Sequence, residues 1–481
     1  MAAESQLAGE THPTAIPTHH RLLYLIAAVA QGIGAVVVQP FAIRLLDPQQ
    51  WGQVSFSLSF ISIGLIAISA GLPMVLSTMY FDPDRGPDKA RSLNGFGVGL
   101  SIVGAGLAAS IFALVTIFNG TIDSVVPYLI SVGIIGFHGI TQMSLAYLRS
   151  QHKALAFVVI TVIATVLGHV AGLLAIIYIA PTATIYMGSF ALCVVAASLA
   201  GVLTSRPGAP MKYRESLRNA VRASLPVLPH SIALVLMLQG ESVLITMLRG
   251  EELVGRYNAV MPLALGPLAV IMALSNVWQT TIFSHRGVDN TGQVAKVQRE
   301  AVFIGFMLTL GGSGVAVLAT HVLVNDPEPV LLLLARTLPL LGYGYVVFLI
   351  STSQLFAIGK TRLMAVVTPC VAAVGLGLAF FPAGSGNLLL LGVIKVTSYL
   401  LLGVAYVFVV RRYDPKLVNM KLMLKGMAAA VAVTVLMLMM PDSIGWGIGS
   451  ALATCVLGLA GGGIYVRRLH RPAAKNGAAI R

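Results

Sequence analysis

The sequence predicts an all-α polytopic membrane protein with about fourteen transmembrane helices. The chain of 481 residues is 57% hydrophobic and only 10% charged, which is far from the composition of water-soluble domains. Apolar runs of about 20 residues, the length that crosses a bilayer, recur from end to end. Basic residues gather in the short intervals between these runs, as the positive-inside rule describes. The net charge of +14 therefore reflects membrane topology and does not indicate nucleic acid as a partner.

The apolar runs define fourteen predicted spans in chain order. They are Leu22–Leu46, Val54–Tyr80, Gly95–Phe118, Ser124–Leu148, Leu155–Ala180, Thr184–Thr204, Leu225–Leu248, Tyr257–Phe283, Ala301–Val324, Arg336–Phe356, Leu363–Phe381, Leu388–Val410, Met423–Met440 and Trp446–Val466. The stretch that begins at Arg21 resembles a signal peptide, but its apolar run continues to Leu46. We therefore expect a retained first helix.

An even number of spans places both termini on one side of the membrane. Twenty-six of the 31 Lys and Arg residues then fall on that side. We therefore expect cytoplasmic N- and C-termini in the cytoplasmic (plasma) membrane. The remaining five basic residues are Arg44, Arg249, Arg256, Arg336 and Lys395. The three cysteines lie inside apolar runs without metal-ligand spacing, so no metal or cofactor is expected.

A short phrase of the sequence occurs twice. The two copies are Arg44–Gln53 and Met247–Arg256. In each copy an apolar helix ends and a short acidic turn leads to a glycine. These glycines, Gly52 and Gly255, are 203 residues apart. Six predicted helices separate equivalent points, which indicates a parallel repeat about an axis normal to the membrane. The predicted organisation is a polar tail (1–20), an N-lobe of six spans (21–204), a linker (205–224), a C-lobe of six spans (225–410), two further spans (411–466) and a basic tail (467–481).

The phrase Arg44–Gly52, together with Gly71-Leu72, Leu225-Pro226 and Val254–Tyr257, resembles the Wzx-like polysaccharide (O-antigen and teichoic-acid) flippases. These proteins belong to the multidrug/oligosaccharidyl-lipid/polysaccharide (MOP) superfamily, with the lipid II flippase and the multidrug and toxin extruders (MATE). The resemblance covers essentially the whole chain in length, span number and loop pattern. It implies a V-shaped pair of six-helix lobes around a central cavity that spans one, two, seven and eight line.

The resemblance also implies a function. Such a protein is a transporter rather than an enzyme, and it moves polyprenyl-pyrophosphate-linked oligosaccharide across the cytoplasmic membrane by alternating access. Its partners would be this lipid-linked substrate, the phospholipid bilayer and, in cell-surface polysaccharide biosynthesis, a polymerase or glycosyltransferases. No ATP site is expected, and the motif G-x-x-x-x-G-K-[ST] does not occur in the sequence.

Polar residues within the predicted cavity helices are the candidate substrate contacts. A carboxylate inside a span, such as Glu241, costs about 2.5–3.5 kcal/mol on insertion scales and is therefore of particular interest. Amides can bind sugar hydroxyls and arginines can bind phosphate, although amides also join helices and arginines also anchor helix ends. The candidate residues are Gln31, Gln39, Arg44, Glu241, Arg249, Asn276 and Gln279.

Glu241 suits a second role better than phosphate binding. It is an anion, and it lies on one face of its predicted helix with His230, about 16 Å away along the axis. The sequence therefore predicts Glu241, alone or with His230, as the site where H⁺ or Na⁺ couples to transport. Lys395 either snorkels toward the interface or pairs with a carboxylate. His138, Gln142 and His169 fit packing positions, and Arg336 is expected to mark the outer edge of span ten.

Two other functions fit the same sequence. A MATE-like antiporter of cations or drugs would use a carboxylate such as Glu241. A non-transporting scaffold of a glycan-assembly complex would need the fold without a transport cycle. The repeated phrases favour the lipid-linked oligosaccharide flippase, driven by an ion gradient or by the membrane potential.

Overall fold

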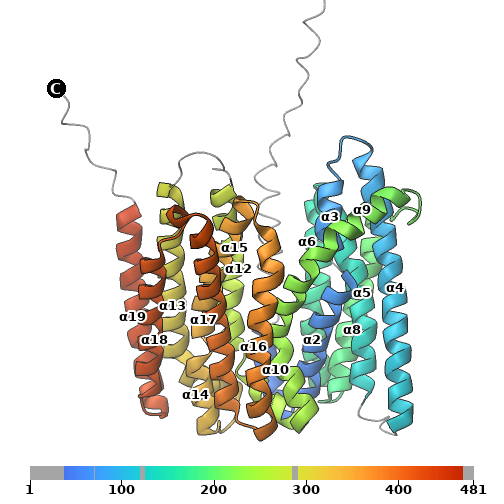
Figure 1. The fold of residues 1–481 in the computed structure, drawn as a ribbon. Helices are drawn as coiled ribbons and strands as arrows, with labels where there is room; N and C mark the ends of the chain where they lie inside the picture. Colours follow the sequence, from blue (N-terminus) through green and yellow to red (C-terminus); the bar gives the residue numbers. More distant parts are fainter. Residues whose placement is uncertain (1–36, 70, 120–124, 284–290, 470–481) are drawn as a thin grey trace, which may run out of the picture.

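The computed structural model describes residues 37–69, 71–119, 125–283 and 291–469, and all the elements in these ranges are helical (Figure 1). Twelve helices are long and apolar enough to cross a membrane, and the bent pair Glu251–Ala259 and Pro262–Ser275 gives a thirteenth span. Thirteen of the fourteen predicted spans thus have a helical counterpart. The first, Leu22–Leu46, lies mostly outside the described residues. The predicted fold class, a polytopic all-α membrane protein, is confirmed.

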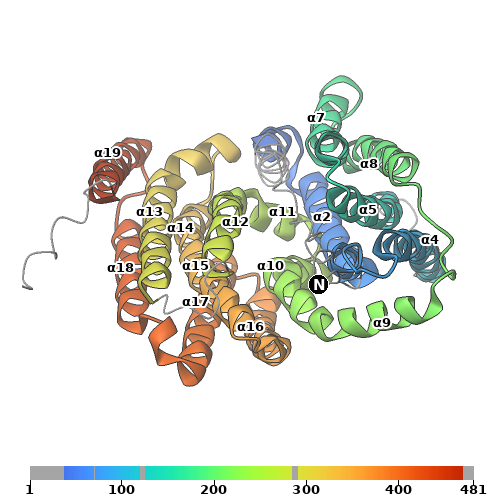
Figure 2. The same ribbon diagram turned by 90° about the horizontal axis from the view of Figure 1, so that it is seen from above.

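The N-terminal part of the chain forms one helix bundle (Figures 1 and 2). Its central helix is α5, which packs against α2, α4 and α8 and is largely buried because neighbours cover most of its faces. The elements of this bundle are α2 (Pro48–Ser69), α3 (Leu72–Met79), α4 (Gly86–Asn119), α5 (Val126–Ser150), α6 (Ala154–Val162), the π-helical turn η1 (Ile163–Leu167), α7 (Gly168–Tyr178) and α8 (Ala183–Ser205).

A second bundle follows the connecting helix α9 (Arg214–Ser224), which runs between the two bundles in Figure 2. Its central helix, α15, packs against α12, α13 and α17, and α18 and α19 lie against α13 at the outer edge. The elements are η2 (Leu225–Val227), α10 (Leu228–Arg249), α11 (Glu251–Ala259), α12 (Pro262–Phe283), α13 (Thr291–Leu323), α14 (Pro329–Thr337), α15 (Leu340–Ala357), η3 (Thr361–Leu363), α16 (Met364–Ser385), α17 (Leu388–Tyr413), η4 (Pro415–Leu417), α18 (Met420–Leu438) and α19 (Ile444–Leu469).

Several predicted spans are divided into separate helices, and two of these breaks, in the spans Val54–Tyr80 and Tyr257–Phe283, illustrate the role of proline. The predicted span Val54–Tyr80 divides after α2, where Gly71 adopts φ +73° and Pro73 opens α3. The predicted span Tyr257–Phe283 bends by 55° between α11 and α12, and Pro262 begins α12. Proline lacks the backbone N–H that would continue the helical hydrogen bonds, so both breaks follow from the sequence.

The prediction that Arg336 marks the outer edge of a span is wrong. The helical segment begins at Pro329 in α14, and Arg336 lies inside it with 2% of its surface exposed. Its guanidinium donates to the carbonyl oxygens of Met440 (2.9 Å) and Pro441 (2.8 Å) and pairs with Asp442 at 2.8 Å. The turn between α18 and α19 supplies all three partners, which is why the charge can be buried there.

The two repeated phrases meet where α2 and α11 cross. A Cβ atom added to Gly52 would collide with the carbonyl oxygen of Glu251, and one added to Gly255 would collide with the carbonyl oxygen of Pro48. Pro48 and Glu251 are 203 residues apart, as are Gly52 and Gly255. Each phrase therefore contacts the other through equivalent residues. This glycine crossing joins the two bundles at the end of α2 that lies opposite α9 (Figure 1).

Candidate functional site

A cavity of about 290 Å³ lies between the two bundles. Residues of α2, α5, η1, α7 and α8 line it from the first bundle, and residues of α10, α11, α12 and α17 line it from the second. Its volume is near the lower end of small-molecule sites, which span about 300–1,000 Å³. A site between two bundles is where an alternating-access transporter would hold its substrate.

Helix α2 contributes a row of hydroxyl groups to this cavity. Ser55, Ser59 and Ser62 all line it, because residues four and three apart share one face of a helix. The Ser59 hydroxyl is 2.8 Å from Oε1 of Gln239 on α10, so the row also connects the two bundles. Gln39, a predicted substrate contact, lines the same cavity and is 9% exposed.

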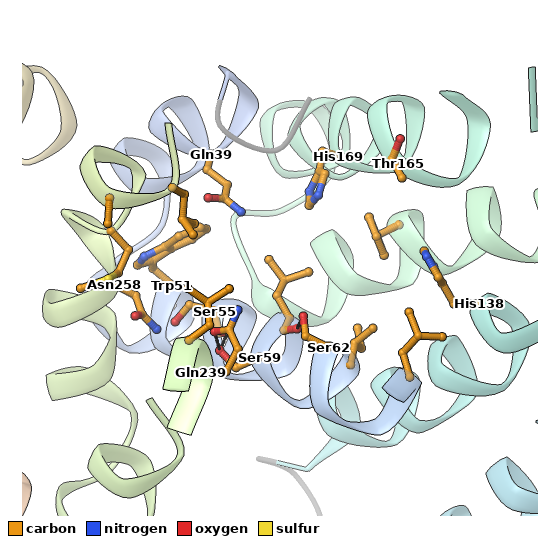
Figure 3. A pocket seen from close by; sticks show the side chains of 18 of the residues that line it. Gln39, Trp51, Ser55, Ser59, Ser62, His138, Thr165, His169, Gln239 and Asn258 are labelled. Atoms are coloured by element: carbon orange, nitrogen blue, oxygen red, sulfur yellow. Dashed lines mark hydrogen bonds between the residues drawn. The ribbon is translucent and has the colours of Figure 1, made fainter. Parts of the chain in front are cut away.

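The wall on the side of the first bundle carries His138, Thr165 and His169 (Figure 3). His169 is held in place by the Tyr186 hydroxyl, 2.9 Å from its Nδ1, and by the Phe190 ring, whose centroid lies 4.9 Å from its own. Nδ1 of His138 is buried and has no hydrogen-bond partner. Such an unsatisfied group costs about 1–3 kcal/mol, and the His138 side chain also lines the cavity.

The opposite wall carries a buried cation. Lys395 on α17 is 2% exposed and lines the cavity. Its Nζ pairs with the Glu241 carboxylate and donates to the carbonyl oxygen of Leu238 at 2.7 Å. The Tyr257 hydroxyl lies 3.5 Å from the same carboxylate. Of the two interpretations of Lys395, the structure shows the carboxylate pair rather than snorkelling.

The pair changes the electrostatic character of the cavity. Glu241 is 4% exposed and is not among the residues that line the cavity, whereas Lys395 is. The carboxylate is therefore held behind the wall and its charge is balanced by the lysine. Among the described lining residues, Lys395 is the one formally charged side chain at neutral pH, and none is Asp or Glu. A ligand in this cavity would meet hydroxyls, amides and imidazoles, together with a lysine whose charge is balanced by Glu241.

The structure brings few of the other predicted site residues to this cavity. Arg44 donates to the carbonyl oxygen of His321 at 2.8 Å and lines a separate cavity of about 280 Å³. Arg249 is exposed at the end of α10. Gln279 is half-buried and does not line the central cavity. Gln31 and the side chain of Asn276 lie outside the described part of the chain.

The structure does not bring His230 together with Glu241. His230 is 8% exposed and its Nδ1 lies 2.8 Å from the Thr368 hydroxyl. That hydroxyl is in turn 2.6 Å from the Tyr406 hydroxyl. His230 thus belongs to a hydrogen-bonded group within the second bundle. Ion coupling through Glu241, with or without His230, stays a prediction.

Sequence reasoning treated several lining residues as packing residues or did not consider them. Lys395 stood out as a basic residue that topology did not explain, and Ser55, Ser59 and Ser62 repeat at helical spacing. His138 and His169 appeared to fit packing positions. Gln239 and Asn258, which also line the cavity, carried no signal beyond polarity within a predicted span.

Comparison with known proteins agrees with this fold. The family model described as "Polysaccharide biosynthesis protein" matches residues 21–279. No protein of curated function matches the chain. Among solved structures, the lipid II flippase MurJ in an inward closed conformation superposes with a TM-score of 0.66 at 12% identity, covering 95% of this chain and 100% of its own.

Two further solved structures widen the comparison. An inward-facing multidrug resistance MATE family transporter of the MOP superfamily has a TM-score of 0.64 at 14% identity, covering 82% of this chain and 94% of its own. A MOP superfamily transporter from Pyrococcus furiosus has a TM-score of 0.51 at 13% identity, covering 83% of this chain and 93% of its own. At these identities the similarity shows the fold alone. With more than half of its residues matched by the family model, the chain belongs to the family described as "Polysaccharide biosynthesis protein".

Proposed function

We propose that this protein flips polyprenyl-pyrophosphate-linked oligosaccharide from the cytoplasmic to the outer leaflet by alternating access. The observation that carries this proposal is the lining of the cavity between the bundles. Its hydroxyl, amide and imidazole groups match the hydrogen-bonding needs of a sugar. Lys395 also lines the cavity, and its ammonium group could bind a phosphate once it left Glu241, with which it is paired in this structure. The lipid tail would remain in the bilayer outside the bundles.

The distribution of the basic residues along the chain supports a setting for this activity. We place the protein in the cytoplasmic membrane with both termini on the cytoplasmic side, where lipid-linked sugars are assembled by glycosyltransferases and would be passed on to a polymerase. An ion gradient or the membrane potential would drive the cycle. In such a cycle H⁺ or Na⁺ would bind Glu241, and Lys395 would have to leave its carboxylate first, because the two groups form one buried pair.

Antiport of cations or drugs is the second candidate, and the MATE-like fold is the observation in its favour. The lining of the cavity argues against it. A cationic substrate needs an accessible carboxylate, but Glu241 is paired behind the wall and the described lining offers Lys395 instead. No observation on the structure favours a scaffold that does not transport.

One preparation tests both candidates. The purified full-length protein in liposomes is given either a fluorescent polyprenyl-pyrophosphate-linked sugar or ethidium under a pH gradient. We expect protein-dependent translocation of the lipid-linked sugar and no ethidium antiport. Ethidium antiport without translocation of the lipid would establish the cation transporter instead. If neither activity is observed, the scaffold remains as the function.

A further inference from the structure

The two walls of the central cavity differ in their chemistry. His138, Thr165 and His169 come from α5, η1 and α7 and lie together on one side in Figure 3. Gln239 and Asn258 lie on the other side in the same view, and Lys395 also lines the cavity from the second bundle. The charged group and the two imidazoles therefore approach a ligand from different bundles.

Hydrogen-bonding capacity on the first of these walls is left unused by the protein. Nδ1 of His138 is buried without a partner. Nδ1 of His169 is occupied by Tyr186, and this contact leaves the other ring nitrogen to face a ligand. The Thr165 hydroxyl donates to the carbonyl oxygen of Thr161 at 2.7 Å and keeps its lone pairs as acceptors. The wall thus offers both donors and acceptors.

The backbone of this wall is also unusual. The π-helical turn Ile163–Leu167 interrupts an otherwise continuous α-helix from Ala154 to Tyr178. Such turns are rare, and they occur mostly as single-turn bulges inside α-helices, frequently at functional sites. Here the turn contains Thr165 and immediately precedes the helix that carries His169, so it sets the position of both side chains at the cavity.

These observations specify the chemistry of the group that the wall would bind. A group that donates and accepts hydrogen bonds suits this wall, because Thr165 and His169 line the cavity and offer a hydroxyl oxygen and a ring nitrogen. The bound group is not required to be a cation, because the described lining residues include no carboxylate that would select one. A volume of about 290 Å³ accommodates a group of about one sugar ring and is too small for a long oligosaccharide.

We propose that this wall is the subsite for a sugar ring of the lipid-linked substrate, with His138, Thr165 and His169 as its hydrogen-bonding groups. The inference rests on the proposed function and adds to it where the sugar is bound. It predicts that the protein distinguishes a lipid that carries a sugar from the same lipid without one. The distinction depends on the wall of the first bundle and is independent of Lys395.

Binding to the purified full-length protein in detergent tests this subsite. The probes are radiolabelled polyprenyl pyrophosphate and the same lipid linked to a hexose, an N-acetylhexosamine or a 6-deoxyhexose. We expect the wild-type protein to bind at least one sugar-bearing lipid about tenfold more tightly than the bare lipid. Thr165→Val or His169→Phe should weaken binding of that lipid about fivefold to tenfold and leave binding of the bare lipid unchanged.

Thr161→Val is the matched control. Thr161 lies one turn before Thr165 and donates to the carbonyl oxygen of Phe157 at the same 2.7 Å, but it does not line the cavity. It should leave both affinities unchanged. If Thr165→Val and His169→Phe weaken binding of the sugar-bearing and the bare lipid equally, these residues have only a structural role, and the subsite is overturned. Equal wild-type affinity for bare lipid and all three sugar-bearing lipids would also overturn it.

This binding experiment separates the subsite from the proposed function. Sugar-dependent binding that responds to the wall variants, with no translocation in liposomes, would support the subsite and contradict the flippase. Translocation without any effect of the wall variants on sugar preference would support the flippase and overturn the subsite. Tight binding of ethidium in competition with the bare lipid, and no preference for sugar, would also overturn it.

Discussion

The ion pair between Lys395 and Glu241 is the residue-scale feature that decides what the cavity can bind. Both side chains are nearly completely buried, and a lone charge at that depth would be expensive. Their pairing, together with the carbonyl oxygen of Leu238 and the hydroxyl of Tyr257, allows a lysine to remain at the cavity wall. The pair is formally neutral, with the lysine at the cavity wall and the carboxylate behind it.

Removing the lysine alone should destabilise the protein strongly. Lys395→Met leaves the Glu241 carboxylate buried without a counter-ion, which costs about 3–5 kcal/mol in free energy of unfolding. The double variant Lys395→Met with Glu241→Gln should recover most of this loss. Thermal unfolding of the purified protein in detergent measures both.

The exposed pairs of Arg256 with Glu252 and Glu328 provide the comparison. Arg256→Met should change the free energy of unfolding by less than about 1 kcal/mol. If Lys395→Met lowers the free energy of unfolding as little as Arg256→Met does, the pair of Lys395 with Glu241 contributes no more to stability than an exposed pair.

Glu241→Gln tests ion coupling at the same residue. A neutral amide cannot exchange H⁺ or Na⁺, so transport driven by an ion gradient should be abolished while exchange without a gradient persists. Glu252→Gln, which neutralises an exposed carboxylate on α11, should leave gradient-driven transport unchanged. Full gradient-driven activity in Glu241→Gln would remove this residue from the coupling mechanism.

At the scale of elements, sequence reasoning worked where the physics is local. Each span is an apolar run of membrane length, so twelve helices and one bent helix pair lie where the sequence predicts spans. Boundaries shifted where polar residues extend a helix into water, as in α13, which begins at Thr291 rather than Ala301. The proline breaks at Pro73 and Pro262 are visible in the sequence for the same reason.

The candidate site was less predictable because its contacts join distant parts of the chain. Lys395 and Glu241 are 154 residues apart, and no spacing rule connects them. The duplicated phrase indicated a repeat. It did not reveal that Gly52 in the first copy packs against the second copy, or that Gly255 in the second copy packs against the first. The orientation of His138 and His169 toward the cavity depends on how α5 and α7 rotate within the bundle, which composition and hydropathy do not determine.

The glycine crossing of α2 and α11 predicts how the cavity is sealed at that end. Gly52→Ala or Gly255→Ala places a methyl group against a backbone carbonyl that has no room for it, so the helices should separate. A cysteine at Ser55, which lines the cavity, with Cys193, Cys370 and Cys455 replaced by serine, reports this opening. Its labelling by an impermeant maleimide from that side should increase several-fold.

Gly106→Ala on α4 is the control for this experiment, because a Cβ at Gly106 meets nothing within 4 Å. It should leave labelling of the cysteine at the wild-type level. Unchanged labelling in Gly52→Ala and Gly255→Ala would show that the crossing does not seal the cavity.

At the scale of the whole molecule, the distribution of charge predicts its orientation. A cysteine at Arg85, between α3 and α4, should be protected from impermeant reagents in intact cells, because that loop is expected on the cytoplasmic side. A cysteine at Asp442, between α18 and α19, should be labelled from outside. The reverse pattern would invert the topology and place the glycine crossing at the cytoplasmic end.

For the whole molecule, we propose that the two helix bundles hold a cavity that binds sugar and through which a lipid headgroup crosses the membrane. Translocation of fluorescent polyprenyl-pyrophosphate-linked sugar in liposomes, followed by an impermeant quencher added outside, tests it most directly. Without protein, quenching should stop at the outer-leaflet fraction, which is about half of a symmetric bilayer. With the protein, nearly all the fluorescence should be lost, and quenching that stops at the protein-free level with or without an ion gradient would contradict the account.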